Sequence, residues 1–148
     1  MTMAQSRLGW QIVAGVLLTG AVAWMVFPTY PVQWMGDPNR GADGPVTDHS
    51  WVAPIVWGYG AFHAPVLVLC ALIAAFGAWL GVVVRRPNRV PAWWALGGVV
   101  IFLAWSIVLG GLMPVTIVPL ALAAGGAAAV LLAARRALPP VISGPAAR

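Results

Sequence analysis

The chain has 148 residues, of which 61% are hydrophobic and only 7% are charged. Soluble domains carry about a quarter of their residues as Asp, Glu, Lys or Arg, so this composition excludes a soluble globular protein. The eight basic residues are all Arg, and with three acids they give a formal net charge of +5. Because the arginines flank apolar runs, they indicate membrane orientation, and no nucleic-acid partner is expected.

Four long apolar runs follow one another along the chain, each close to the ~20 residues that a helix needs to cross ~30 Å of hydrocarbon. No Asp, Glu, Lys or Arg falls inside these runs. The sequence therefore predicts an all-α integral membrane protein with the lipid bilayer as its first partner. We expect a single domain, a four-transmembrane-helix bundle formed by residues 8–27, 62–84, 92–112 and 115–134.

The first run and the loop after it contain contrasting signals. Arg7, the apolar stretch and the small residues Ala21 and Ala23 imitate a signal peptide, but the stretch is longer than a usual signal core, so a retained helix is expected. Residues 28–61 are rich in Pro and Gly and predict an irregular outer loop. Within it, residues 51–61 suit a segment lying along the membrane surface or the first turns of the second helix.

The remaining connections are short. Arginines and prolines form the turn between the second and third runs, and only Met113 and Pro114 separate the third run from the fourth. A tight antiparallel hairpin of the last two helices follows from this spacing. The tail at residues 137–148 contains three prolines and predicts disorder.

The arginines predict the orientation of the bundle. Seven of the eight fall on one side of the alternating runs, and only Arg40 falls on the other. The positive-inside rule makes the arginine-rich side cytoplasmic, so both termini should be cytoplasmic and the Asp-bearing loop should lie outside. The use of Arg without Lys suggests a GC-rich prokaryotic genome, hence a prokaryotic cytoplasmic membrane. The arginines that carry this prediction beside the later runs are Arg85, Arg86, Arg89, Arg135 and Arg136.

Small residues recur at four-residue spacing in two of the runs. Gly77 and Gly81 lie in the second run, and Ala121 and Gly125 lie in the fourth. In lipid, such strips let helix backbones approach closely and pack tightly. The sequence leaves open whether these faces pack inside the bundle or against another subunit.

Two histidines are the candidate ligands for a metal or cofactor. His63 lies near the outer end of the second run, and His49 lies in the outer loop beside Asp48. Imidazole and carboxylate suit zinc, and imidazole with nearby methionine suits copper, but the spacing matches no ligand template. A solvated loop and a neutral, hydrogen-bonded His63 are the simpler interpretation, and the sequence requires no cofactor.

The function follows mainly from what the spans lack. They hold no carboxylate or cation for proton coupling, and no nucleophile has a base in evident reach, so an enzyme is not expected. The leading hypothesis is a non-catalytic accessory or structural subunit of a larger membrane complex, respiratory or transport in type, docking other membrane subunits. One alternative is a small oligomeric transporter or channel for a neutral or lipid-like cargo. A second is an outer-side metal or redox protein that uses His49 and His63.

Overall fold

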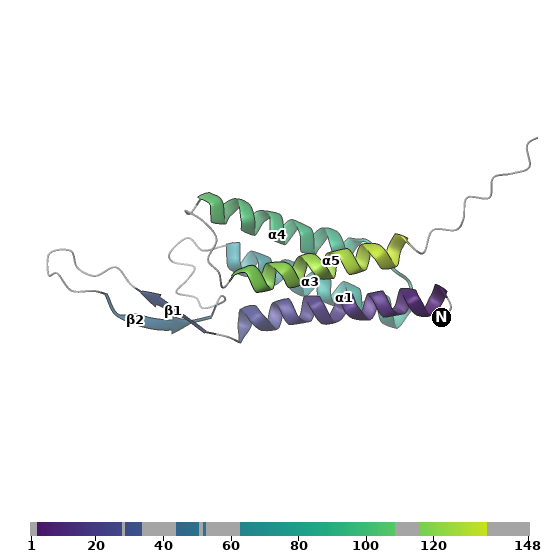
Figure 1. Cartoon of the computed structure of the whole chain (residues 1–148), viewed down its shortest axis with the longest axis horizontal. Coiled ribbons are helices and arrows are strands. Elements are labelled where there is room, and N and C mark those ends of the chain that lie inside the picture. Colours follow the sequence, from purple (N-terminus) through teal and green to yellow (C-terminus); the bar gives the residue numbers. More distant parts are fainter. Residues whose placement is uncertain are drawn as a thin grey trace, which may run out of the picture.

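The computed structural model describes residues 3–27, 29–33, 44–50, 52, 63–108 and 116–135. Within these ranges the chain forms four long helices and one two-stranded sheet (Figure 1). In chain order the elements are α1 (Met3–Val26), β1 (Tyr30–Gln33), β2 (Val46–His49), α3 (His63–Val84), α4 (Val90–Val108) and α5 (Ile117–Arg135).

All four helices are long and apolar enough to cross a bilayer, with spans of 22, 21, 19 and 19 residues. The predicted helical bundle with four membrane-length helices is therefore confirmed, and the chain is a multi-pass membrane protein. Two of the helices, α1 and α4, begin earlier than predicted. α1 begins at Met3 and includes the polar residues before its apolar run. α4 begins at Val90, and Pro91 fits its first turn because the missing N–H costs little there. Residues 109–115, which include the end predicted for the third span, lie outside the described residues.

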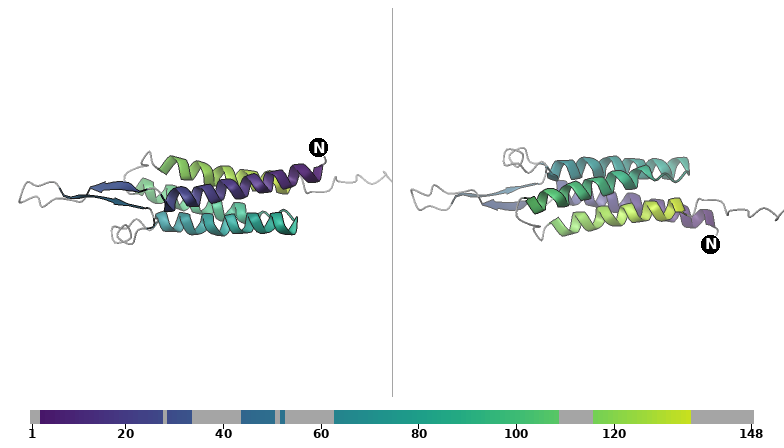
Figure 2. Two further views of the ribbon diagram at one scale, coloured as in Figure 1. Left: turned by 90° about the horizontal axis from the view of Figure 1, so that it is seen from below. Right: turned by 90° about the horizontal axis from the view of Figure 1, so that it is seen from above.

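The helices run alternately up and down and form a closed ring (Figures 1 and 2). The main packing contacts join α1 to α3, α3 to α4, α4 to α5, and α5 back to α1. Each helix thus has its chain neighbours beside it, and the first and last helices close the bundle. Short connections from α3 to α4 and from α4 to α5 favour this antiparallel arrangement, whereas a longer segment with the two strands joins α1 to α3.

The core divides along the bundle axis into two halves of different composition. One half is built mostly from alanine, including Ala14, Ala74 and Ala127, with Leu18 as its largest side chain. The other half contains larger groups, among them Met25 and Phe102. Small side chains permit helix backbones to approach closely in lipid.

A short antiparallel hairpin extends from the end of the bundle where α1 ends and α3 begins (Figure 1). The prediction of an irregular loop did not include this hairpin. Tyr30 pairs with His49 and Gln33 pairs with Val46. Both strands are edge strands, so Pro31 is tolerated in β1. Beyond the hairpin, Val52 packs against the Met25–Phe102 half of the core. The rest of the segment 51–61, predicted to lie along the surface or to form the first turns of the second helix, is outside the described residues, as are Arg136 and the tail 137–148.

The end of the bundle opposite the hairpin gathers the start of α1, the loop between α3 and α4, and the end of α5 (Figures 1 and 2). It carries Arg7, Arg85, Arg86, Arg89 and Arg135, and we call it the arginine end. The arginines that predict the orientation therefore share one end of the molecule wherever the structure describes them.

Candidate functional site

The predicted outer-side ligands are spread over the hairpin and the start of α3. His49 is half-buried at the end of β2, where Nε2 lies 2.7 Å from Thr47 Oγ1 in a hydrogen bond. Asp48 is exposed opposite Pro31, and His63 is the first residue of α3. Within the described ranges, no three His, Cys, Asp or Glu residues come together as a metal site. Binding of a metal or cofactor by His49 and His63 stays a prediction without a structural argument in its favour.

The predicted packing residues face the interior of the bundle to different degrees. A Cβ atom on Gly77 would lie 2.8 Å from Pro91 Cγ of α4, and one on Gly81 would lie 3.0 Å from Gln11 Nε2 of α1. Gly125 is looser, at 3.5 Å from Leu17 Cδ1. Ala121 is exposed on the outside of α5, so any packing role for it would involve lipid or another molecule. The three glycines thus lie against neighbouring helices of the bundle, and whether these faces also contact another subunit stays a prediction.

Three further glycines make closer contacts that the four-residue pattern did not single out. A Cβ on Gly126 would lie 2.6 Å from Leu18 Cγ, and one on Gly98 would lie 2.7 Å from Cys70 Cβ. One on Gly15 would lie 2.7 Å from the Trp79 ring, whose Nε1 donates a hydrogen bond of 3.1 Å to Thr19 Oγ1. Glycine therefore marks the close approaches at the α1–α5, α3–α4 and α1–α3 contacts.

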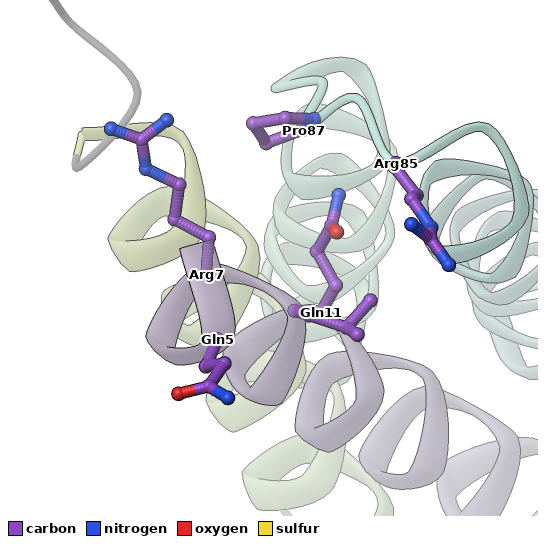
Figure 3. Close-up of a pocket in the computed structure, with 6 residues that line it drawn as sticks. Gln5, Arg7, Gln11, Arg85 and Pro87 are labelled. Atoms are coloured by element: carbon purple, nitrogen blue, oxygen red, sulfur yellow. The ribbon is translucent and has the colours of Figure 1, made fainter. Parts of the chain in front are cut away.

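A polar pocket of about 320 Å³ opens at the arginine end, between the start of α1 and the loop that follows α3. Figure 3 shows the Gln11 amide directed toward Pro87, with Arg7 on one side of it and Arg85 on the other. The lining consists of Gln5, Arg7, Leu8, Gln11, Arg85 and Pro87. These residues supply guanidinium and amide donors with two apolar side chains and no carboxylate, thiol or imidazole.

Gln11 is the most buried polar side chain of this pocket. It is only 6% exposed, and its side chain lines the pocket. Its position depends on Gly81, because a Cβ there would press on the amide nitrogen at 3.0 Å. The amide is therefore held by packing, with its hydrogen-bonding capacity directed into the pocket.

Arg85 reaches the pocket from a strained backbone. Its φ of 56° lies in the left-handed region, where a residue with a Cβ is disfavoured and glycine is usual. The amide N of Arg85 bonds the carbonyl of Val82 at 3.3 Å, and that of Arg86 bonds the carbonyl of Gly81 at 3.2 Å. This pair of bonds is a Schellman ending of α3, with an arginine at the position that glycine normally takes.

Arg7 completes the pocket from α1. Its Nε atom is buried and has no hydrogen-bond partner among the described residues. No Asp or Glu occurs in the four helices or in residues 85–89, so no side-chain carboxylate of these segments neutralises either arginine. The pocket is consequently a concentration of positive charge with unused donors.

The sequence contains one indication of this site, which the length and hydrophobicity of the membrane spans do not reveal. Arg7 and Gln11 are four residues apart, which places them on one face of a helix. A glutamine inside an otherwise apolar run indicates a polar surrounding. Its proximity to Arg85 depends on how α1 and α3 pack, so only the three-dimensional structure brings the three residues together.

Comparisons of the chain with models of protein families, with curated proteins and with solved structures found no match.

Proposed function

We propose that the protein is a non-catalytic accessory subunit of a larger complex in a prokaryotic cytoplasmic membrane, with both termini and the arginine end in the cytoplasm. The uncharged spans and the alanine-rich core support a packed scaffold, since neither provides a relay for protons or ions. The clustering of Arg7, Arg85 and Arg135 at one end supports the orientation.

The outer face of α4 is the observation that carries the proposal. It holds an apolar groove of about 320 Å³ lined by Cys70, Val90, Trp93, Trp94, Gly97 and Ile101. Gly97 is exposed, and a Cβ there would meet nothing within 4 Å. Trp93 and Ile101 flank it, one helical turn away on each side.

An outward-facing glycine on a membrane helix offers little contact to lipid and lowers helix propensity. It does permit another helix to come close, which is how small residues act at helix contacts in membranes. The adjacent Gly98 is used inside the bundle against Cys70, whereas Gly97 has no such use within the described residues. The groove around Gly97 therefore suits a helix from a partner subunit.

Photo-cross-linking in native membranes tests this. Benzoyl-phenylalanine replaces Ile101, which is 49% exposed in the groove, or Val16, which is 56% exposed on α1 and serves as the control. The proposal expects one discrete adduct with another membrane polypeptide from position 101 and none of comparable yield from position 16. A partner-free, monodisperse particle with no protein adduct from position 101 would contradict it.

A second pair of variants separates docking from folding. Gly97→Leu fills the groove, and Gly9→Leu is the matched control, because a Cβ at Gly9 also meets nothing within 4 Å. Gly97→Leu should lower recovery of the partner from membranes extracted into lipid-polymer particles, and Gly9→Leu should not. An adduct between two copies of this chain would instead favour the oligomeric channel, which flux measurements in liposomes containing only this protein then test.

A further inference from the structure

The pocket at the arginine end holds buried hydrogen-bonding groups that the packing of the bundle does not use. Gln11 is 6% exposed and directs its amide into the pocket, and the Nε atom of Arg7 is buried and has no hydrogen-bond partner among the described residues. Buried polar groups in folded proteins nearly always have a partner, from the protein, water or a ligand. These two groups, from one face of α1, point to a partner outside the chain.

The chemistry of the lining indicates what this partner is. Guanidinium groups present several N–H donors in a planar fork that matches phosphate and carboxylate oxygens. The Gln11 amide adds two donors, and the lining contains no carboxylate that would repel an anion. Arg7 and Arg85 lie on opposite sides of the amide (Figure 3), so an anion bound at the amide has an arginine on each side.

The backbone at Arg85 supports the same conclusion. A left-handed φ of 56° is easier for glycine or asparagine than for arginine, yet an arginine occupies this helix ending. The strained backbone is a cost to folding. The two Schellman hydrogen bonds would form equally well with glycine at this position, so they do not explain the arginine. An arginine here places a cation at the pocket rim, which is a binding role.

The position of the pocket identifies the source of the anion. It lies at the end of the bundle, where membrane helices leave the hydrocarbon and meet the headgroups. Ile12, next to Gln11, and Val84, next to Arg85, are both exposed and apolar, as expected for contact with acyl chains. Basic pockets between membrane helices are known to hold anionic lipid headgroups.

We propose that the arginine-end pocket binds the phosphate group of an anionic phospholipid. Arg7 and Arg85 pair with the phosphate oxygens, the Gln11 amide donates to the same group, and the acyl chains lie on the outer faces of α1 and α3. The shared chemistry is that of a phosphate monoanion, and the lipid is its source. This inference does not depend on the accessory-subunit function, since it concerns the isolated chain.

The test uses the full chain in nanodiscs that mix phosphatidylglycerol with phosphatidylcholine of identical acyl chains. Native mass spectrometry measures the ratio of the two lipids retained on the released protein. The wild-type chain should retain phosphatidylglycerol in excess of its share in the nanodisc. Loss of one charge-assisted contact corresponds to about tenfold weaker binding, so Arg7→Gln and Arg85→Asn should each lower the excess by about that factor.

Two further variants distinguish the pocket from a diffuse positive surface and from a folding defect. Arg89→Gln removes an exposed charge from the same end and lies outside the pocket lining, so it should leave the excess unchanged. Arg85→Asn tolerates the left-handed backbone, and Gln11→Leu keeps the volume of a buried side chain, so both should melt no lower than the wild type in detergent. An equal loss of phosphatidylglycerol in Arg89→Gln and in the pocket variants would overturn the proposal.

The remaining arm tests the source of the phosphate. Inorganic phosphate at millimolar concentration is added to the nanodiscs before release. Unchanged retention of phosphatidylglycerol supports a lipid site, whereas its displacement shows that the pocket takes free phosphate and overturns the lipid assignment. A wild-type chain that retains the two lipids in the proportion of the nanodisc also overturns it. None of these results bears on partner recovery by cross-linking at Ile101.

Discussion

Gly97 and Gly98 are neighbours in α4 but face different surroundings, and replacing each by alanine should change stability in opposite directions. A Cβ on Gly97 would meet nothing within 4 Å, whereas one on Gly98 would lie 2.7 Å from Cys70 Cβ and 3.2 Å from Leu67 Cδ1. The two substitutions add the same methyl group at the same depth in the same helix. They therefore differ only in what that group contacts.

The magnitude follows from the distance to Cys70. Two carbon atoms are in best contact at about 3.5–4.0 Å, so the 2.7 Å approach at Gly98 requires α3 and α4 to separate by about 1 Å. Rotation of a side chain cannot relieve this contact, because the Cys70 Cβ atom is bonded directly to the α3 backbone. Overpacking of this kind costs about 1–3 kcal/mol, and alanine returns up to about 1 kcal/mol in helix propensity. We expect Gly98→Ala to lower the free energy of unfolding by about 1–2 kcal/mol, and Gly97→Ala to raise it by up to about 1 kcal/mol.

The assay is reversible unfolding in mixed micelles of a mild detergent and SDS, followed by tryptophan fluorescence and circular dichroism. The double variant Gly98→Ala with Cys70→Gly removes the contacting carbon and should recover most of the lost stability. The coupling between the two substitutions is then a direct measure of the helix contact. If Gly98→Ala were as stable as Gly97→Ala, the close approach of α3 and α4 at this point would be wrong.

Three further predictions use the same protein preparation. Trp79→Phe removes the indole donor to Thr19 Oγ1 and should lower the free energy of unfolding by about 0.6 kcal/mol. Thr19→Val should give a similar loss, and the two losses should not add in a double-mutant cycle. Additive losses would show that the hydrogen bond contributes nothing. Arg85→Gly relieves the strain of the left-handed backbone and should raise the free energy of unfolding by about 1 kcal/mol in the same micelle titration. A decrease would show that the arginine side chain stabilises the fold by more than the backbone strain costs. Single cysteines replacing Arg40 and Arg86 in a cysteine-free chain should react with a membrane-impermeant maleimide from opposite sides of sealed vesicles, and labelling from the same side would contradict the predicted orientation.

The helices could be predicted from the sequence because the bilayer imposes their length and composition. α3 begins at His63 and ends at Val84, within one residue of the predicted 62–84, since charged and Pro-rich segments bound the apolar run on both sides. The hairpin could not be predicted in the same way. Its strands are four residues long and contain Pro31 and Asp48, which are poor strand formers, and they pair across an intervening segment that local patterns do not connect.

The helix contacts were harder to predict than the helices because a run of small residues does not indicate which face of the helix makes the contact. From Ala123 to Ala129 every residue of α5 is Ala or Gly, so several faces satisfy a four-residue spacing equally well. The structure places Gly126, and not Gly125, at the closest approach to α1, where Leu18 is the facing side chain. That choice depends on the shape of the neighbouring helix, which enters only once two helices are brought together.

The arginine-end pocket shows the same dependence of polar chemistry on packing. The core near it is built mainly from alanine, so the helices are drawn together, and Gly81 leaves the space that the Gln11 amide occupies. Gln11 is 6% exposed, and a leucine of similar size at this position would bury no polar group. Packing alone therefore favours an apolar residue at position 11, just as the helix ending of α3 alone favours glycine at position 85. Two unrelated backbone segments each carry a residue that folding disfavours, and both residues line one pocket beside the unpartnered Nε of Arg7. A ligand that bonds both arginines and the amide accounts for all three residues together, which independent accidents of packing at the two segments would not do.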